Sequence, residues 1–474
     1  MNPERKQPNI IWIMSDDLSW GDLGCFGQDK IETPNLDRLR EGGMLMEGCH
    51  SGSPLCAPAR SSLMQGLHQG HATVRDNMVS FEGGMYRHSL QPDDVTVAEI
   101  LKDAGYATGL FGKWGLAVHD QPGIPNNTGF DEFCGYLNQR KAHNYYPPYL
   151  WHDQEKTHFP GNIGHDHTKP NAYDDDGRII PNGVEDPAEA VYSFDHYAEK
   201  SLDFVRRHSP DPFFLYLAYT IPHAAFEVPN LGAYAEKDWP RSHRAFAAMV
   251  TRMDSAVGRL LDTLEDLGLT EDTLIFFVSD NGYSFDEAVR DPSLDDVFDH
   301  RGPWRGAKGN LLQGGVRVPA IARWPGRIEE GSISDFIWTF WDFLPTAAEV
   351  AGVAPPKNTD GVSILPALHG HPGDMKERDH LYWELGDAQT VRIGPHWAHR
   401  PHPDADIEVY LAEEDPQLTN DLSSDRTDIV RTAQHVFRSE HSPTPYFPSP
   451  GETREDWQSR REAAGAGLCD NVNT

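Results

Sequence analysis

The stretch NIIWIMSDD, residues 9–17, places a run of bulky apolar side chains directly before two carboxylates. A short, nearly continuous apolar run of this kind is typical of a strand that is buried on both faces of a parallel sheet. Similar runs follow at residues 106–111, 213–219, 274–278 and 318–322. We therefore expect a sheet of buried strands, with Asp16 and Asp17 at the end of its first strand.

Helical patterns lie between these runs. Thr33 and Pro34 are typical of a helix start, with Thr33 as the cap and Pro34 as the first helical residue. A longer helix is predicted before Gly268, which stands where a helix end favours glycine. Its apolar residues recur at helical spacing: Met249, Val250, Met253, Val257, Leu260, Leu261 and Leu264. The alternation of strands and helices predicts an α/β fold with a large, mostly parallel mixed sheet flanked by helices.

The pattern changes in the last fifth of the chain. After about residue 375 the apolar runs shorten to three strand candidates, at residues 380–384, 390–393 and 407–411. We therefore predict two domains. Residues 1–375 would form the large α/β domain, and residues 376–474 a smaller C-terminal α+β subdomain with short antiparallel strands and a tail.

Composition excludes several kinds of partner. The formal net charge of −32 would repel nucleic acids and anionic membranes, so an acidic substrate would have to be attracted by a metal or a local basic pocket. No apolar stretch is suited to a signal peptide or a membrane span. The five cysteines are odd in number and widely spaced, which is atypical of a disulfide framework or a zinc site. We expect a cytoplasmic protein without nucleic-acid or membrane partners.

Carboxylate and amide side chains follow two of the predicted strands. Asp16 and Asp17 follow the first, and Asp280 and Asn281 follow the run at residues 274–278. Ligands of an open parallel sheet lie beyond the carboxyl ends of its strands, so these side chains are expected to meet. A single Asp after a strand is often only a turn residue. Two such pairs on separate strands favour a site for a hard cation such as Ca²⁺ or Mg²⁺.

A cysteine-containing segment is the second chemically active element. Residues 53–66, SPLCAPARSSLMQG, predict a helix that begins at about Cys56, where the helix dipole favours negative charge. Arg60 lies about one turn further on and is able to reach back towards Cys56. The alternative interpretation is a small buried cysteine at a helix start, as most free cysteines are.

The Cys56 segment resembles the sulfatase signature C-x-P-x-R, in which a maturation enzyme oxidises the cysteine to formylglycine. Other blocks resemble the same family in the same order along residues 8–345. These blocks are Asp16-Asp17, Gly112-Lys113-Trp114, Pro222-His223, Asp280-Asn281-Gly282, Lys308-Gly309 and Gly314-Gly315-Val316-Arg317-Val318-Pro319. The chain is therefore similar to formylglycine-dependent, arylsulfatase-like members of the alkaline phosphatase superfamily.

The resemblance implies a set of roles. One Ca²⁺ or Mg²⁺ per chain would be bound by Asp16, Asp17, Asp280, Asn281 and the matured Cys56. Arg60 and Lys113 would steady the hydrate of formylglycine, while His223 and Lys308 would bind the sulfate and assist departure of the alcohol. One hydroxyl of the hydrate would attack sulfur, and the other would expel sulfate afterwards.

Two positions depart from the family pattern. Gly115 stands where sulfatases usually carry a histidine, two residues after Lys113, and Gln313 stands where many carry a glutamate. The missing imidazole would be supplied by His143, which lies in the aromatic stretch at residues 142–147. In the alternative interpretation His143 has only a structural role.

The sequence therefore predicts hydrolysis of sulfate monoesters, with a sulfated carbohydrate or an aryl sulfate as the substrate. Three alternatives stay open. The chain would be a phosphonate or phosphate monoester hydrolase of the same superfamily, a binding protein with unconverted Cys56, or a thiol hydrolase with a histidine base. Several aromatic residues would form a platform for a sugar or aryl ring or would simply pack: Tyr136, Tyr145, Tyr146, Tyr149 and Trp151.

Overall fold

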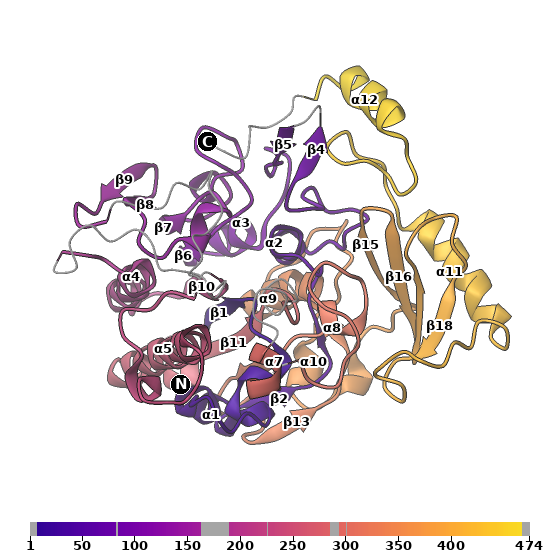
Figure 1. Ribbon diagram of the computed structural model, residues 1–474. Helices are drawn as coiled ribbons and strands as arrows, with labels where there is room; N and C mark the ends of the chain where they lie inside the picture. The colour runs from indigo at the N-terminus through magenta and orange to yellow at the C-terminus, as the bar shows by residue number, and fades with distance from the viewer. Residues whose placement is uncertain are drawn as a thin grey trace.

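A ten-stranded sheet forms the centre of the computed structural model, which describes residues 7–81, 84–162, 189–224, 226–284, 293–299 and 301–466. The strand order is β13-β2-β12-β11-β1-β10-β6-β7-β8-β9 (Figure 1). The four strands β11, β1, β10 and β6 run parallel, whereas β12, β8 and β9 are antiparallel to their neighbours. The expected large mixed sheet is confirmed.

The strands of this sheet are β1 (Asn9–Asp16), β2 (Met44–Met46), β6 (Ala107–Lys113), β7 (Glu132–Tyr136), β8 (Tyr149–His152), β9 (Glu155–His158), β10 (Phe213–Pro222), β11 (Thr273–Ser279), β12 (Ala320–Arg323) and β13 (Ser332–Ser334). Two of them run further than predicted, because Lys113 is the last residue of β6 and Pro222 the last of β10. The strand predicted at residues 318–322 is β12. It pairs antiparallel with β11, so it does not contribute a carboxyl end to the same edge.

Both faces of β1 are buried, as a continuous apolar run requires. Ile11 and Ile13 pack on one face with helices α4 (Ser193–His208) and α5 (Arg241–Asp266). Trp12 packs on the other face, with helices α2 (Cys56–Gln65), α3 (Val97–Asp103) and α9 (Phe343–Ala351). Each of these three side chains is fully buried, and full burial of one large apolar side chain contributes roughly 1.5–3 kcal/mol. This packing fixes the position of the carboxylates that follow β1.

Helix α1 (Pro34–Glu41) begins where the sequence predicts, but its cap is a different residue. Thr33 makes no capping hydrogen bond, because its hydroxyl accepts one from the N–H of Gly24 at 2.8 Å. The carboxylate of Asp254, on α5, accepts from the backbone N–H groups at residues 35 and 36 instead. A distant helix thus satisfies donors that a local residue was expected to bind. Helix α5 ends at Asp266, two residues before Gly268.

The C-terminal part forms a second, four-stranded antiparallel sheet of β15 (Leu381–Leu385), β16 (Ala388–Ile393), β17 (His396–Arg400) and β18 (Glu408–Leu411). Strand β17 was missed by the prediction, and the boundary at residue 375 stays a prediction. Helix α11 (Thr427–Ser439) covers one face of this sheet (Figure 1). On the other face, Trp383 Nε1 donates to the carbonyl of Ser51 at 2.9 Å, so the sheet packs against the segment that leads into α2.

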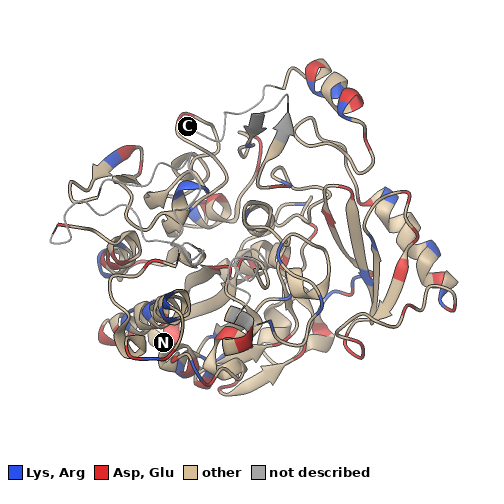
Figure 2. Cartoon of the chain, viewed as in Figure 1, with Lys and Arg blue, Asp and Glu red and all other residues tan. Residues whose placement is uncertain are grey.

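The remaining elements are β3 (Cys49–His50), β4 (Val79–Phe81), β5 (Gly84–Tyr86), β14 (Trp338–Thr339), α7 (Ser293–Phe298), α8 (Gln313–Val316), α10 (Leu365–Leu368) and α12 (Arg454–Ala463). Figure 2 shows charged residues along outer helices such as α5 and α12. Within the described ranges, every helix is too short or too polar to traverse the hydrocarbon layer of a membrane. Cys25, Cys49, Cys56 and Cys134 are free thiols, and Cys469 lies outside the described residues.

Candidate active site

Four neighbouring parallel strands end at one edge of the sheet, and the predicted site residues lie there. Asp16 ends β1 and Asp17 follows it, Lys113 ends β6, His223 follows β10, and Asp280 follows β11. All five side chains are buried. Because β1 lies between β10 and β11, residues that are far apart in the sequence meet at this edge.

The backbone of Asp17 adopts an uncommon conformation. Its φ of 64° lies in the left-handed region, which costs a non-glycine residue of the order of 1–3 kcal/mol. In this conformation the N–H of Asp17 points at Oδ1 of Asp280, 3.3 Å away. The neighbouring amide of Asn281 donates to Oδ1 of Asp17 at 2.8 Å. The strained turn therefore holds the two polar pairs against each other.

Helix α2 begins at Cys56, as predicted, and directs its first side chain at the end of β1. Cys56 Sγ lies 3.5 Å from Oδ1 of Asp16. The N–H of Ala57 donates to Oδ1 of Asn77 at 2.9 Å, so a side chain outside the helix satisfies one of its free donors. Burial, followed by the negative charge of Asp280, raises the pKa of the Cys56 thiol well above its usual value. This protonated thiol is unsuited to the thiol-hydrolase alternative, which requires a thiolate.

Each carboxylate of the site lies close to a cation. Lys113 Nζ lies 2.6 Å from Asp16, Arg60 Nη2 lies 2.8 Å from Asp280, and Lys308 Nζ lies 2.7 Å from both carboxylate oxygens of Asp17. Buried charges are tolerated when they are paired in this way.

The pKa values of Asp17 and Asp280 shift in opposite directions. Burial by itself would raise the pKa of Asp17, but Lys308 and His223 hold it well below its usual value. Burial, followed by repulsion from Asp16, raises the pKa of Asp280 to about 6. A further positive charge would therefore stabilise the ionised form of Asp280.

The cluster offers oxygen donors that fit a divalent cation. Asn281 Oδ1 is buried and has no hydrogen-bond partner within the described ranges, which is costly for a polar atom unless a ligand satisfies it. Ligand atoms of Asp16, Asp17, Cys56 and His223 also lie within 4.8 Å of one another. Carboxylate and amide oxygens are the donors that Ca²⁺ and Mg²⁺ prefer. The predicted metal-binding residues therefore fit such an ion.

Two histidines lie side by side at the site. The rings of His143 and His223 stack with centroids 3.8 Å apart and an interplanar angle of 20°. Nδ1 of His223 lies 2.6 Å from the carbonyl oxygen of Ala224 and must be the donor, because a carbonyl only accepts. The other ring nitrogen, Nε2, lies 3.3 Å from Oδ2 of Asp17. Burial lowers the pKa of His223 to about 3, although the charge of Asp17 opposes this shift. His143 therefore lies beside His223, and its role as the missing imidazole stays a prediction.

The two departures from the family pattern have local explanations. Gly115 has a φ of 79°, and a Cβ there would lie 3.0 Å from Oε1 of Gln139, so histidine would be strained at this position. Gln313 lies in α8 and accepts a hydrogen bond from Arg317 at 3.1 Å. Neither Gly115 nor Gln313 contributes a charged group to the sheet edge at which the site residues lie.

The predicted aromatic platform is largely a packing feature. Tyr136, Tyr145 and Tyr146 are buried, and the hydroxyl of Tyr145 donates to the carbonyl of Thr220 at 2.8 Å on β10. Tyr149 and Trp151, on β8, pack edge to face and remain partly exposed. These side chains therefore support the sheet edge more than they offer a flat binding surface.

The sequence reasoning missed Arg87. Its guanidinium donates to Oδ1 of Asn138 at 2.8 Å, and its buried Nε has no partner among the described residues. The positive charge of Arg87 contributes to the lowered pKa of His143. Arg87 directly follows β5 and lies in none of the blocks that resemble the family, so nothing in the sequence indicated it.

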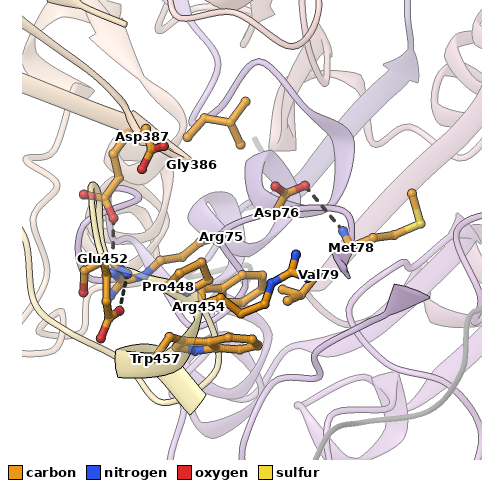
Figure 3. Close-up of a pocket in the computed structure, with 14 residues that line it drawn as sticks. Arg75, Asp76, Met78, Val79, Gly386, Asp387, Pro448, Glu452, Arg454 and Trp457 are labelled. Atoms are coloured by element: carbon orange, nitrogen blue, oxygen red, sulfur yellow. Dashed lines mark hydrogen bonds and ion pairs between the residues drawn. The ribbon is translucent and has the colours of Figure 1, made fainter. Parts of the chain in front are cut away.

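A cavity of about 330 Å³ lies beside the start of α2. One wall comes from Arg75, Asp76, Met78 and Val79, and the other from the C-terminal part, including Glu452, Arg454 and Trp457 (Figure 3). Asn77, which follows Asp76 in the chain, accepts a hydrogen bond from the N–H of Ala57. The cavity therefore adjoins the helix turn that carries Cys56.

The chain is similar to known proteins in sequence and in fold. The family model described as sulfatase matches residues 8–353, and that described as N-sulphoglucosamine sulphohydrolase, C-terminal, matches residues 307–430. The N-acetylgalactosamine-6-sulfatase of Canis lupus familiaris is 32% identical over 403 residues, covering 83% of this chain and 71% of the relative. Human arylsulfatase G is 32% identical over 422 residues, covering 82% and 75%. The crystal structure of Ps i-CgsB superposes with a TM-score of 0.75 at 23% identity, covering 97% and 98%.

Proposed function

Since the chain belongs to the sulfatase family and hydrolyses sulfate esters, we propose that it acts on a sulfated carbohydrate through a formylglycine made from Cys56. One observation carries the proposal. Cys56 begins α2, and its Sγ lies 3.5 Å from Asp16 inside a buried set of paired carboxylates and cations. A maturation enzyme that oxidises Cys56 is the partner this proposal requires.

The proposed metal is one Ca²⁺ or Mg²⁺, held by oxygens of Asp16, Asp17, Asp280 and Asn281 together with residue 56. Such an ion would supply positive charge that makes the nucleophilic hydroxyl more acidic and neutralises sulfate oxygens. The unpartnered Asn281 Oδ1 supports this assignment. Matured residue 56 would supply a hydrated aldehyde, with one hydroxyl to attack sulfur and another that allows sulfate to leave.

The chain's own cations would position the ester. Arg60 and Lys113 are anchored on Asp280 and Asp16, so they would orient residue 56 without moving. Lys308 is partly exposed and would bind a sulfate oxygen. His223 is anchored through Nδ1, so its Nε2 would deliver a proton to the leaving alcohol, with Asp17 stabilising the charged ring.

The cavity beside α2 supports a saccharide substrate. Asp76 lines it, and the described residues offer this carboxylate only backbone N–H donors, while burial raises its pKa to about 6. Sugar hydroxyls would supply the missing donors. A cavity with a few polar groups among apolar walls is suited to one sugar ring. The names of the related proteins, such as N-acetylgalactosamine-6-sulfatase, point to the same class of substrate.

The test compares kcat/KM of the matured enzyme for 4-nitrophenyl sulfate, 4-nitrophenyl phosphate, phenylphosphonate esters and N-acetylgalactosamine 6-sulfate. We expect the sulfates to be preferred and the sugar sulfate to exceed the aryl sulfate. A preference for phosphate or phosphonate would favour the related monoester hydrolases instead. Binding of sugar sulfate without turnover, with an intact Cys56 thiol, would favour a binding protein.

A further inference from the structure

Arg87 is a half-buried cation without a counterion among the described residues. Within that part of the chain its side chain makes one hydrogen bond, to the neutral amide of Asn138, and its buried Nε has no partner. Burial, followed by the positive charge of Arg140, lowers the pKa of Arg87 to about 10. In the described part of the chain no carboxylate pairs with either arginine. A guanidinium in such a position is costly unless an anion joins it.

The carboxylates of the site do not neutralise Arg87. The three carboxylates of Asp16, Asp17 and Asp280 are already paired with Lys113, Lys308 and Arg60. The guanidinium of Arg87 donates to Asn138, which lies two residues after the end of β7 at Tyr136. Tyr136 pairs with Lys113 at the end of β6, so Arg87 lies near the sheet edge where the ester would react. One positive charge is therefore left over at the edge of the catalytic cluster, on a side chain that is partly accessible.

We propose that Arg87 binds a second anionic group of the substrate, a carboxylate or a further sulfate, next to the sulfate ester that is cleaved. This inference rests on the proposed function, because it assigns the substrate of that same site. The planar guanidinium binds either anion through paired N–H groups. Asn138 holds one end of it, and the described residues use none of its other N–H donors. The substrate would then be a doubly anionic saccharide.

Three saccharide probes distinguish whether Arg87 binds a second sulfate or a carboxylate. N-acetylgalactosamine 6-sulfate carries one anion, the 4,6-disulfate carries two sulfates, and a uronate-containing disaccharide 6-sulfate carries one sulfate and one carboxylate. Binding is measured by calorimetry on Cys56→Ala, which does not turn over, and kcat/KM on the matured enzyme. Each measurement is repeated with Arg87→Gln and Arg87→Lys. Arg323→Gln is the matched control, because Arg323 has a buried, unpartnered Nε far from the site, on β12.

We expect Arg87→Gln to weaken binding of one or both doubly anionic probes by roughly 10- to 100-fold and of the singly anionic probe by less than about threefold. Arg87→Lys should recover part of the loss, and Arg323→Gln should cause none. Without ligand, Arg87→Gln should not lower Tm, since it removes an unpaired buried charge.

Two results would overturn the inference. An equal loss for all three probes, or a lower Tm without any change in selectivity, would mean that Arg87 has only a structural role while sulfatase activity stands. If the matured enzyme hydrolyses none of the probes and Cys56→Ala binds none, the proposed function fails as well.

Discussion

The imidazole of His143 lies flat against that of His223, with ring centroids 3.8 Å apart. Two charged imidazolium rings in this arrangement would repel each other, and burial together with the neighbouring ring lowers the pKa of His143 well below its usual value. Among the described residues, only His223 of the two has a carboxylate beside its Nε2, that of Asp17 at 3.3 Å. At most one ring of the pair therefore carries a second proton and a positive charge. The carboxylate of Asp17 favours that charge on His223, although burial opposes it.

His223→Ala should slow esters of basic alcohols severely, by about 10²- to 10⁴-fold, and should spare 4-nitrophenyl sulfate. The physical reason is that a good leaving group scarcely needs a proton. The measurement is the slope of log kcat/KM against the pKa of the leaving alcohol, which should steepen in the variant. An unchanged slope would transfer the acid role to Lys308.

His143→Ala should lower kcat/KM by a similar factor for all esters, because the stacked ring positions His223 and does not meet the leaving oxygen. The same series of leaving groups provides the measurement. His143→Phe keeps an aromatic ring against His223 and should recover most of the activity. A steepened slope for His143→Ala would instead identify His143 as the residue that protonates the leaving alcohol.

Cys56 should be converted to formylglycine when the chain is co-expressed with a maturation enzyme. The mass of the tryptic peptide that spans residues 41–60 should show the aldehyde at Cys56 and an intact thiol at Cys49, which is buried and lies outside the signature. Cys56→Ala should abolish turnover. Hydrolysis by a preparation that contains only the thiol would contradict the assignment of the nucleophile.

Asp280→Ala should remove the bound divalent ion and reduce turnover by far more than the ~10²- to 10³-fold typical of losing one stabilising hydrogen bond. It also leaves Arg60 without its carboxylate partner. Metal content by mass spectrometry and kcat are measured together. Asp254→Asn, which affects only the start of α1, is the control and should retain the ion. Retention of the ion by Asp280→Ala would refute the predicted metal site.

The contact between His71 and Asp360 should make stability depend on pH. The hydrogen bond that His71 Nδ1 donates to the carboxylate of Asp360 raises the pKa of His71 above its ordinary value of 6.5, so the folded state favours the protonated ring. This stabilisation is fully present below pH 6.5 and is lost as the pH rises through the raised value. The difference in free energy of unfolding between the wild type and His71→Gln, measured by urea denaturation, should therefore shrink from pH 6 to pH 9. A difference that is independent of pH would contradict this.

Much of the site was predictable because its signals are local. A buried strand reveals itself by a continuous apolar run, and the residues that follow it must lie at the sheet edge. Asp16, Asp17, Asp280 and Asn281 were found in this way, and the helix start at Cys56 was found from the segment at residues 53–66. Arg87 and Asn77 were not found, since each lies in a loop whose composition gives no indication of what it faces. Strand β17 was also missed, because residues 396–400, HWAHR, contain only two apolar side chains and neither an apolar run nor a strict alternation.

Sequence alone was sufficient for the α/β class, for the chemistry at the strand ends and for the resemblance to sulfatases, because periodicity and motif spacing are properties of the chain. Which site residues contact one another was decided only by the tertiary structure. The sheet places β11, β1, β10 and β6 in an order that differs from the chain, so Asn281 bonds to Asp17 across 264 positions and Arg60 pairs with Asp280 across 220. The same folding leaves Arg87 without a carboxylate among the described residues. Charge pairing depends on distance in space, and no local pattern of residues encodes that distance.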